Sequence, residues 1–175
     1  GINKHGHGES LFDFLKKRYS LKKESIAVLD LGYGEGHFLA ELKKMLKEDR
    51  IPSKVEGLSL ADNATSENKK LIDKRTNIPA TEHVLTKKYD LIVDVWGVFS
   101  YSFNSIKKEL LLKYAHSLKI GGMLVTNLEY MKGSPKLEFI INHLKKQGFS
   151  ACFYEKNSES SNSHKYNTLI IQRIK

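Results

Sequence analysis

The chain has 175 residues and a net charge of +9, from 29 lysines and arginines against 20 aspartates and glutamates. That length suits one domain, and 40% hydrophobic with 28% charged residues is the composition of a folded protein rather than a disordered one. The best apolar run, Leu91 to Phe99, contains Asp94 and falls well short of the ~18 residues of a membrane span. The single cysteine, Cys152, excludes an internal disulfide framework and a cysteine-rich zinc site, so a reducing, cytoplasmic location is expected.

The first residues, GINKHGHGES, lack both a starting methionine and the apolar core of a signal peptide. We expect residues 1–8 to be a tail and residues 9–175 to be one domain. The sequence is also expected to be an excerpt of a longer chain or to begin with a cloning remnant. Two histidines in the tail, His5 and His7, have no third ligand beside them, so no metal site is predicted.

Hydrophobic periodicity predicts helices and strands that alternate along the chain. In chain order we expect helix 9–19, strand 26–31, helix 38–47, strand 54–60, helix 62–72, strand 89–95, helix 106–118, strand 123–128, helix 137–146 and strands 149–155 and 167–174. Gly121 and Gly122 are expected to end the fourth of these helices. Residues 73–86 are the least readable, and a third strand there is hidden or very short.

This alternation predicts an α/β fold: a doubly wound, mostly parallel sheet between two layers of helices, in three α/β/α layers. The last two strands have no helix between them, so an antiparallel C-terminal hairpin is expected at one edge. In such an open sheet a ligand binds beyond the carboxyl ends of the strands, near the point where the strand order reverses. Residues that follow the first, second and fourth expected strands are therefore the candidates for a site.

A glycine-rich loop, DLGYGEG over residues 30–36, follows the first expected strand. Its three glycines at alternate positions let a ligand lie against bare backbone. The dinucleotide fingerprint G-x-G-x-x-G fails because its sixth position is His37, and no G-K-[ST] follows to make a phosphate loop. The acids Asp30 and Glu35 disfavour a polyphosphate and favour a ligand with positive groups, such as the sulfonium and ammonium of S-adenosylmethionine.

Three motifs together resemble the class I S-adenosylmethionine-dependent methyltransferases. DLGYGEG is similar to that family's D-x-G-x-G-x-G, and residues 89–93, YDLIV, to its fourth strand, F-D-L-I-V. Residues 118–124, LKIGGML, are similar to its L-K-P-G-G-x-L turn, with Ile120 in place of the proline. The terminal hairpin is similar to the family's reversed seventh strand, and the resemblance covers about residues 11–175. It implies a methyltransferase with S-adenosylmethionine as cofactor and S-adenosylhomocysteine as product.

By this resemblance Gly32, Gly34 and Gly36 line the methionine end of the cofactor, and Asp30 organises the loop. The alternative for Asp30 is that it merely caps the following turn. His37 either contacts the cofactor or simply begins the helix.

The chain departs from the family where an acid at the end of the second strand binds the ribose, because Ser59 stands there. A hydroxyl cannot match a carboxylate against two ribose hydroxyls. Asp62 is either a substitute for this acid or an ordinary helix cap. The acid that faces adenine is expected after the third strand, with Asp73 or Glu82 as candidates.

The predicted catalytic residues, Asp94 and Tyr101, lie near the end of the fourth strand and after it, where this fold places the acceptor. A buried carboxylate is costly unless it is paired or used, so Asp94 is interpreted as a base or an acceptor-binding group. The alternative is that it lies in solvent or caps a turn. Tyr101 and Ser100 would supply hydroxyl contacts, and Trp96 and Phe99 would form an apolar wall or pack in the core.

The leading functional hypothesis is a methyltransferase with a small-molecule acceptor, because the domain is nearly minimal. One alternative is a catalytically inactive binding or regulatory domain, favoured by Ser59 and by the lack of a recognisable acceptor motif. Another is an RNA-directed methyltransferase, suggested by the charge of +9 alone. The basic residues come as scattered pairs on the polar faces and ends of predicted helices, however, so a solvated surface is the favoured explanation.

Overall fold

The structure is a computed structural model, which describes residues 10–95, 97–101, 104–128, 135–155 and 167–175. For Ser100, Tyr101, Asn104, Ser105 and Glu155 it describes the backbone alone. Three residues discussed above, His5, His7 and Trp96, lie outside the described residues. In the described part of the chain, no helix is long and apolar enough to cross a membrane.

One sheet of seven strands, in the order β3-β2-β1-β4-β5-β7-β6, forms the centre of the described structure. Its strands are β1 (Ile26–Leu31), β2 (Ser53–Ser59), β3 (Lys74–Asn77), β4 (Tyr89–Asp94), β5 (Leu118–Leu128), β6 (Phe149–Glu155) and β7 (Asn167–Arg173). The pairs among β1 to β5 are parallel, and β7 runs antiparallel to both β5 and β6. The predicted mostly parallel sheet and its C-terminal hairpin at one edge are confirmed.

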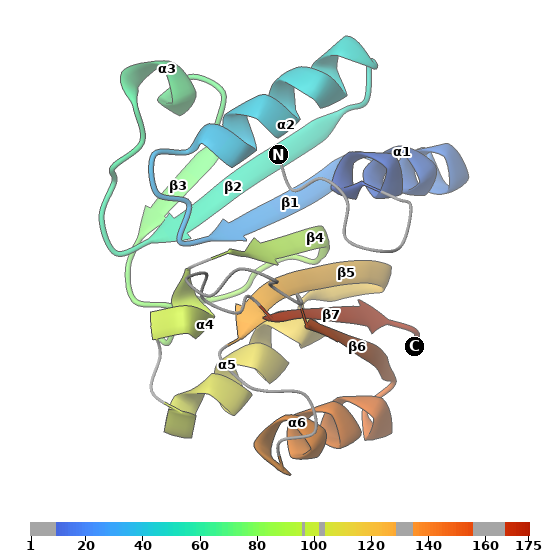
Figure 1. Cartoon of the computed structure of the whole chain (residues 1–175). Helices are drawn as coiled ribbons and strands as arrows, with labels where there is room; N and C mark the ends of the chain where they lie inside the picture. Colours follow the sequence, from blue (N-terminus) through green and yellow to red (C-terminus); the bar gives the residue numbers. More distant parts are fainter. Residues whose placement is uncertain (1–9, 96, 102–103, 129–134, 156–166) are drawn as a thin grey trace.

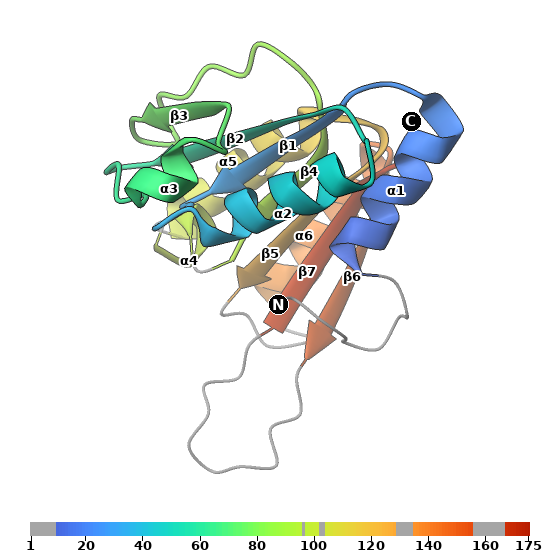
Figure 2. The same ribbon diagram turned by 90° about the horizontal axis from the view of Figure 1, so that it is seen from above.

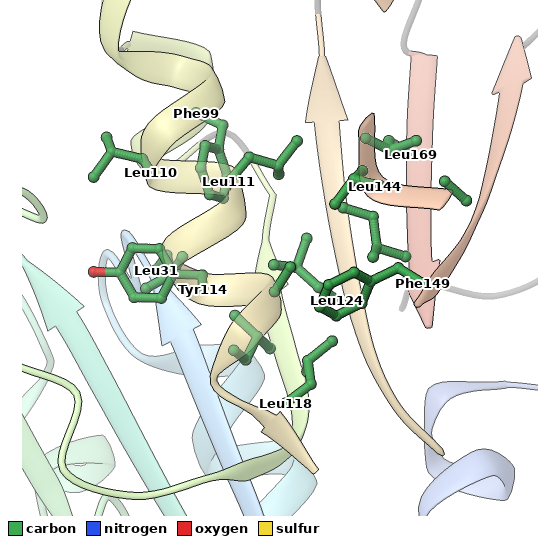
Figure 3. Close-up of a cluster of buried hydrophobic side chains, with 14 of the residues drawn as sticks. Leu31, Phe99, Leu110, Leu111, Tyr114, Leu118, Leu124, Leu144, Phe149 and Leu169 are labelled. Carbon is green, nitrogen blue, oxygen red and sulfur yellow. The ribbon is translucent and has the colours of Figure 1, made fainter. Parts of the chain in front are cut away.

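Helices cover both faces of the sheet, so the three-layer α/β/α arrangement is also confirmed (Figure 1, Figure 2). One face carries α1 (Leu11–Lys22), α2 (His37–Glu48) and α3 (Ser66–Lys69), and the other carries α4 (Val98–Tyr101), α5 (Asn104–His116) and α6 (Pro135–Lys146). Alternate residues of β1 supply both cores, because Val28 packs with the first set of helices and Leu29 with the second. Phe99, Tyr114 and Leu124 lie together in the second core (Figure 3).

A buried ionic network fixes α1 against the amino ends of the strands. The Asp90 carboxylate accepts hydrogen bonds from the Arg18 side chain of α1 at 3.0 Å, from Lys119 at 2.8 Å and from the backbone N–H of Ala27 at 2.9 Å. The other end of α1 begins at a capping box between Ser10 and Asp13. Arg18 therefore ties α1 to the sheet, and the capping box stabilises the start of the helix, which lies beside β1 and β4.

The prediction that Gly121 and Gly122 end a helix is wrong. The helix α5 already ends at His116, and the glycine pair lies inside β5, where its register with β4 shifts. Gly121 has a φ of +73°, which favours glycine, and a Cβ there would lie 2.7 Å from the Arg18 guanidinium. The two glycines thus form a β-bulge that leaves room for Arg18.

The prediction of a helix over residues 62–72 is also wrong, because only the single turn of α3 is helical there. Thr65 caps that turn, whereas Asp62, for which a helix cap was one of two alternatives, is engaged elsewhere. Its carboxylate accepts a hydrogen bond from the Tyr33 hydroxyl at 3.1 Å and pairs with Arg75 at 3.4 Å. These longer-range contacts hold residues 62–64 away from a helical path.

Candidate functional site

The glycine loop follows β1, whose neighbours in the sheet are β2 and β4. It therefore lies at the point where the strand order reverses. Its three glycines, Gly32, Gly34 and Gly36, have φ values of +81°, +51° and +79°, a region that other residues rarely adopt. The Gly32 N–H donates a hydrogen bond to the Leu58 carbonyl at 2.6 Å, which ties the loop to the end of β2. The expected strand-to-helix turn is present.

Among the described residues, only one of these glycines has open space beside it. A Cβ on Gly32 would lie 2.6 Å from the Gly97 Cα, and one on Gly36 would lie 2.7 Å from the Ile72 side chain. A Cβ on Gly34 would meet nothing described within 4 Å. The backbone of Gly97 therefore requires glycine at position 32, and Gly36 packs against the Ile72 side chain, while Gly34 offers bare backbone to a ligand.

We expect Gly32→Ala to destabilise the fold and Gly34→Ala to leave it nearly intact. The first substitution combines backbone strain of about 1 kcal/mol with a collision against Gly97, whereas the second adds only the strain. Urea denaturation should show a loss of unfolding free energy at least about 2 kcal/mol larger for Gly32→Ala. Equal losses in the two variants would contradict this assignment of roles.

Asp30 lies at the carboxyl end of β1, next to the glycine loop. Its side chain is 7% exposed, and it makes no ion pair or side-chain hydrogen bond with any residue that the structure describes. Burial, followed by the negative charge of Asp94, raises the pKa of Asp30 to about 7. A buried carboxylate without a partner is costly, and an external cation would offset that cost.

Asp94 lies at the end of β4 and is fully buried. Burial raises its pKa to about 7, against the opposing effect of hydrogen bonds from the Thr126 hydroxyl at 2.9 Å and the Phe99 N–H at 3.1 Å. Asp94 thus holds the start of α4, which is the capping alternative left open by the sequence. Tyr101 ends α4, and its side chain lies outside the described part of the structure.

A second polar cluster lies at the carboxyl ends of β2 and β3. The Tyr33 side chain is 5% exposed and packs over Gly57, where a Cβ would collide with its ring. Its hydroxyl donates to Asp62 at 3.1 Å and accepts from the Asn77 side chain at 3.1 Å. Asn77 also lies within 3.5 Å of the Ser59 carbonyl oxygen, so the structure brings Ser59 and Asp62 to the same end of the sheet as the glycine loop.

The sequence contains a signal for this cluster. Tyr33 is a large side chain between two glycines of the loop, and Gly57 supplies the matching gap in β2. Leu60, which directly follows β2, is 77% exposed, an unusual position for a large apolar residue at the mouth of a site.

The structure does not bring Asp73 or Glu82 to the glycine loop. Asp73 precedes β3 rather than following it, and its carboxylate accepts hydrogen bonds from the Val55 N–H at 2.7 Å and from Lys43 at 2.8 Å. It therefore fastens the amino ends of β2 and β3. Glu82 lies in the connection from β3 to β4, beside the amino end of β4. His37 begins α2 and contacts the Glu35 carboxylate at 2.8 Å.

A cavity of about 420 Å³ opens beside the glycine loop. We call it the α1–α2 pocket, because it lies between these two helices. Asp30, Gly32 and Tyr33 line its inner end. Its walls include Leu11 and Phe12 from α1, Phe38, Glu41, Leu42 and Met45 from α2, and Val93 and Val95 from β4 and its end.

A second cavity, of about 500 Å³, lies at the amino ends of β4 and β5. Its lining includes Lys87, Lys88, Lys113 and His116, so we call it the basic cavity. Lys87 pairs with Glu56 at 2.6 Å, and the other two lysines donate to backbone carbonyls. The basic cavity is thus at the opposite end of the sheet from the glycine loop.

No protein-family model and no curated protein matches the chain. Solved structures do match it. A Listeria monocytogenes protein provisionally classed as a class I S-adenosylmethionine-dependent methyltransferase superposes with a TM-score of 0.67 and 13% identity, over 93% of this chain and 58% of that one. The chain therefore spans less than two thirds of that protein.

In two further matches, this chain covers a larger share of the other protein. The magnesium protoporphyrin IX methyltransferase ChlM of Synechocystis PCC 6803, with bound S-adenosylmethionine, matches at a TM-score of 0.61 and 13% identity, over 96% of this chain and 86% of that one. A Clostridium thermocellum protein provisionally classed as an rRNA methylase matches at a TM-score of 0.62 and 16% identity, over 92% of this chain and 96% of that one. The chain has the fold of the class I S-adenosylmethionine-dependent methyltransferases.

Proposed function

We propose that the protein is an S-adenosylmethionine-dependent methyltransferase, with the cofactor held at the carboxyl ends of β1 and β2. The observation that carries this proposal is Asp30, a buried carboxylate without a described partner beside the open backbone of Gly34. A ligand with an ammonium and a sulfonium supplies the positive charge that this carboxylate lacks.

The remaining residues of the site suit the other parts of the cofactor. Ser59 and Asp62 would face the ribose, and the exposed Leu60 side chain would gain apolar cover from the adenine ring. Lys69 beside Asp62 lowers the pKa of that carboxyl, so it is ionised at neutral pH. A dinucleotide fits less well, because its pyrophosphate would meet the Asp30 charge rather than a basic group.

When bound, the cofactor supplies a methyl group activated by its sulfonium. The task of the protein in such a displacement is to align the acceptor and to exclude water. Asp94 contributes as a positioning residue, since its carboxylate holds the start of α4 directly after β4. Tyr101, at the end of α4, remains a candidate for a hydroxyl contact with the acceptor.

An RNA acceptor is the second candidate, supported by the charge of +9 and by the likeness to a provisional rRNA methylase. The lysines of the basic cavity make this less favourable, because that cavity is remote from the glycine loop. RNA binding that falls steeply with salt would support this candidate.

Titration calorimetry tests the proposal. We expect S-adenosylmethionine and S-adenosylhomocysteine to bind and NAD not to bind. Gly34→Val should abolish binding by filling the open backbone, while Asp49→Asn, an exposed change on the far end of α2, should not. Release of S-adenosylhomocysteine from S-adenosylmethionine in the presence of an acceptor would separate an active enzyme from an inactive binding domain. Tight binding of NAD, with no binding of S-adenosylmethionine or S-adenosylhomocysteine, would overturn the proposal.

A further inference from the structure

We infer that the α1–α2 pocket is the acceptor site and that the acceptor is a small amine with an apolar body. The inference rests on the proposed function, because it takes the glycine loop as the methyl-donor site. In the transfer the bound ammonium first loses a proton to water, which frees the lone pair on nitrogen. The nitrogen then bonds to the methyl carbon as the carbon–sulfur bond breaks with its electron pair left on sulfur.

The charge of the pocket points to an amine. Its described lining contains no lysine or arginine, although the chain has 29 of them. It contains two carboxylates, Asp30 and Glu41, and neither forms an ion pair with any described residue. Lys16, whose ammonium lies 5.2 Å from the Phe12 ring, is paired with Asp49 at 2.8 Å. The lining also includes His37, which contacts Glu35 at 2.8 Å. With Asp30 facing the cofactor, the exposed Glu41 carboxylate gives the outer part of the pocket a negative charge, which favours a cation.

The walls of the pocket point to an apolar body on that amine. Phe12 from α1 and Phe38 and Met45 from α2 are half-buried, so each offers apolar surface that the described residues leave uncovered. An apolar lining with few polar groups is the common character of small-molecule sites. Aromatic rings beside a carboxylate also bind ammonium groups well.

The extent of the pocket leaves room for a second molecule beside the cofactor. Its inner end at Asp30 and Gly32 is shared with the glycine loop, whereas Glu41 and Met45 lie farther along α2. From His37 to Met45 this helix spans about 12 Å. A group bound at the glycine loop would therefore leave the outer part free.

The same features disfavour a nucleic acid in this pocket. A phosphate beside Asp30 and Glu41 would meet two negative charges, and the lysines of the basic cavity lie at the other end of the sheet. We therefore choose the amine over RNA as the occupant.

Three probes with the same apolar body test the inference: phenethylamine, 2-phenylethanol and 3-phenylpropionate. Their binding to the full chain, saturated with S-adenosylhomocysteine, is measured by NMR titration. We expect phenethylamine to bind about tenfold more tightly than 3-phenylpropionate, because Glu41 attracts the ammonium and repels the carboxylate while Asp30 is paired with the bound ligand. Glu41→Gln should weaken phenethylamine about three- to fivefold and leave 2-phenylethanol unchanged. Glu48→Gln, on the same helix but outside the pocket lining, is the matched control and should change neither.

The inference is overturned if the anionic probe binds as well as the amine, if no probe binds, or if Glu48→Gln acts like Glu41→Gln. In those cases binding of S-adenosylhomocysteine to the same samples leaves the proposed function standing. If S-adenosylhomocysteine itself does not bind, the proposed function fails, and amine binding alone does not make the pocket an acceptor site.

Discussion

Replacing Asp30 with asparagine is expected to weaken S-adenosylhomocysteine binding about 10- to 100-fold, the loss of a hydrogen bond to a charged group. The same change should stabilise the protein without ligand at pH 8. Asp30 is buried beside Asp94, and its ionisation there is unfavourable, which is why its pKa is raised to about 7. Asp30→Asn should therefore raise the free energy of unfolding at pH 8 while it weakens ligand binding, because the same charge destabilises the fold and binds the ligand's ammonium.

The pH dependence has a definite direction. Because the pKa of Asp30 is higher in the folded chain than in the unfolded one, its contribution to stability is complete below about pH 4 and is lost as the pH rises through about 7. Asp30→Asn should therefore raise the free energy of unfolding by about 2 kcal/mol or more at pH 8 and change it little at pH 4. Cofactor binding by the unsubstituted protein should tighten from pH 6 to pH 8, as the carboxylate becomes charged.

Urea denaturation at the two pH values and calorimetry with S-adenosylhomocysteine measure both effects. Asp49→Asn is the control, since Asp49 has an exposed pair with Lys16 and lies outside the site. A variant that is less stable at pH 8, or that binds the ligand as well as the unsubstituted protein, would contradict the role assigned to Asp30.

Asp90→Ala should produce the largest loss of stability, about 3–5 kcal/mol. The substitution leaves the Arg18 and Lys119 cations without their buried carboxylate and the Ala27 N–H without its acceptor. The side chains of Arg18 and Asp90 are 11% and 4% exposed, so water cannot readily replace the lost contacts. The measurement is the free energy of unfolding in urea at pH 7.

Asp49→Ala is the matched control for this second prediction. It removes the pair with Lys16, whose two side chains are 46% and 40% exposed, and should cost less than about 1 kcal/mol. Since α1 forms one wall of the α1–α2 pocket, Asp90→Ala should also weaken the binding of phenethylamine. A loss for Asp90→Ala no greater than that for Asp49→Ala would show that the network does not hold α1 in place.

The sequence was sufficient for features that depend on local pattern. Apolar runs such as residues 26–31 and 89–94 identified the buried parallel strands, because both faces of such strands are covered. The glycine loop was identified because alternate glycines before a helix have few other uses. The missing helix before the last strand predicted the antiparallel hairpin.

Features that depend on distant partners could not be predicted in this way. Gly121 is conformationally suited to a helix end and to a β-bulge alike, and only the position of Arg18 distinguishes them. Asp62 has the local pattern of a helix cap, but Tyr33 and Arg75 compete for its carboxylate. Asp73 was a candidate for the acid after the third strand, but it precedes β3. A strand of four residues has too little pattern for its start to be predicted.

The most direct measurement is a crystal structure of the protein with S-adenosylhomocysteine. We predict the ligand over Gly34, with its ammonium beside the Asp30 carboxylate and its ribose at Ser59 and Asp62. A ligand found elsewhere, such as in the basic cavity, or a glycine loop that stays empty at saturating ligand, would contradict the assignment of this site.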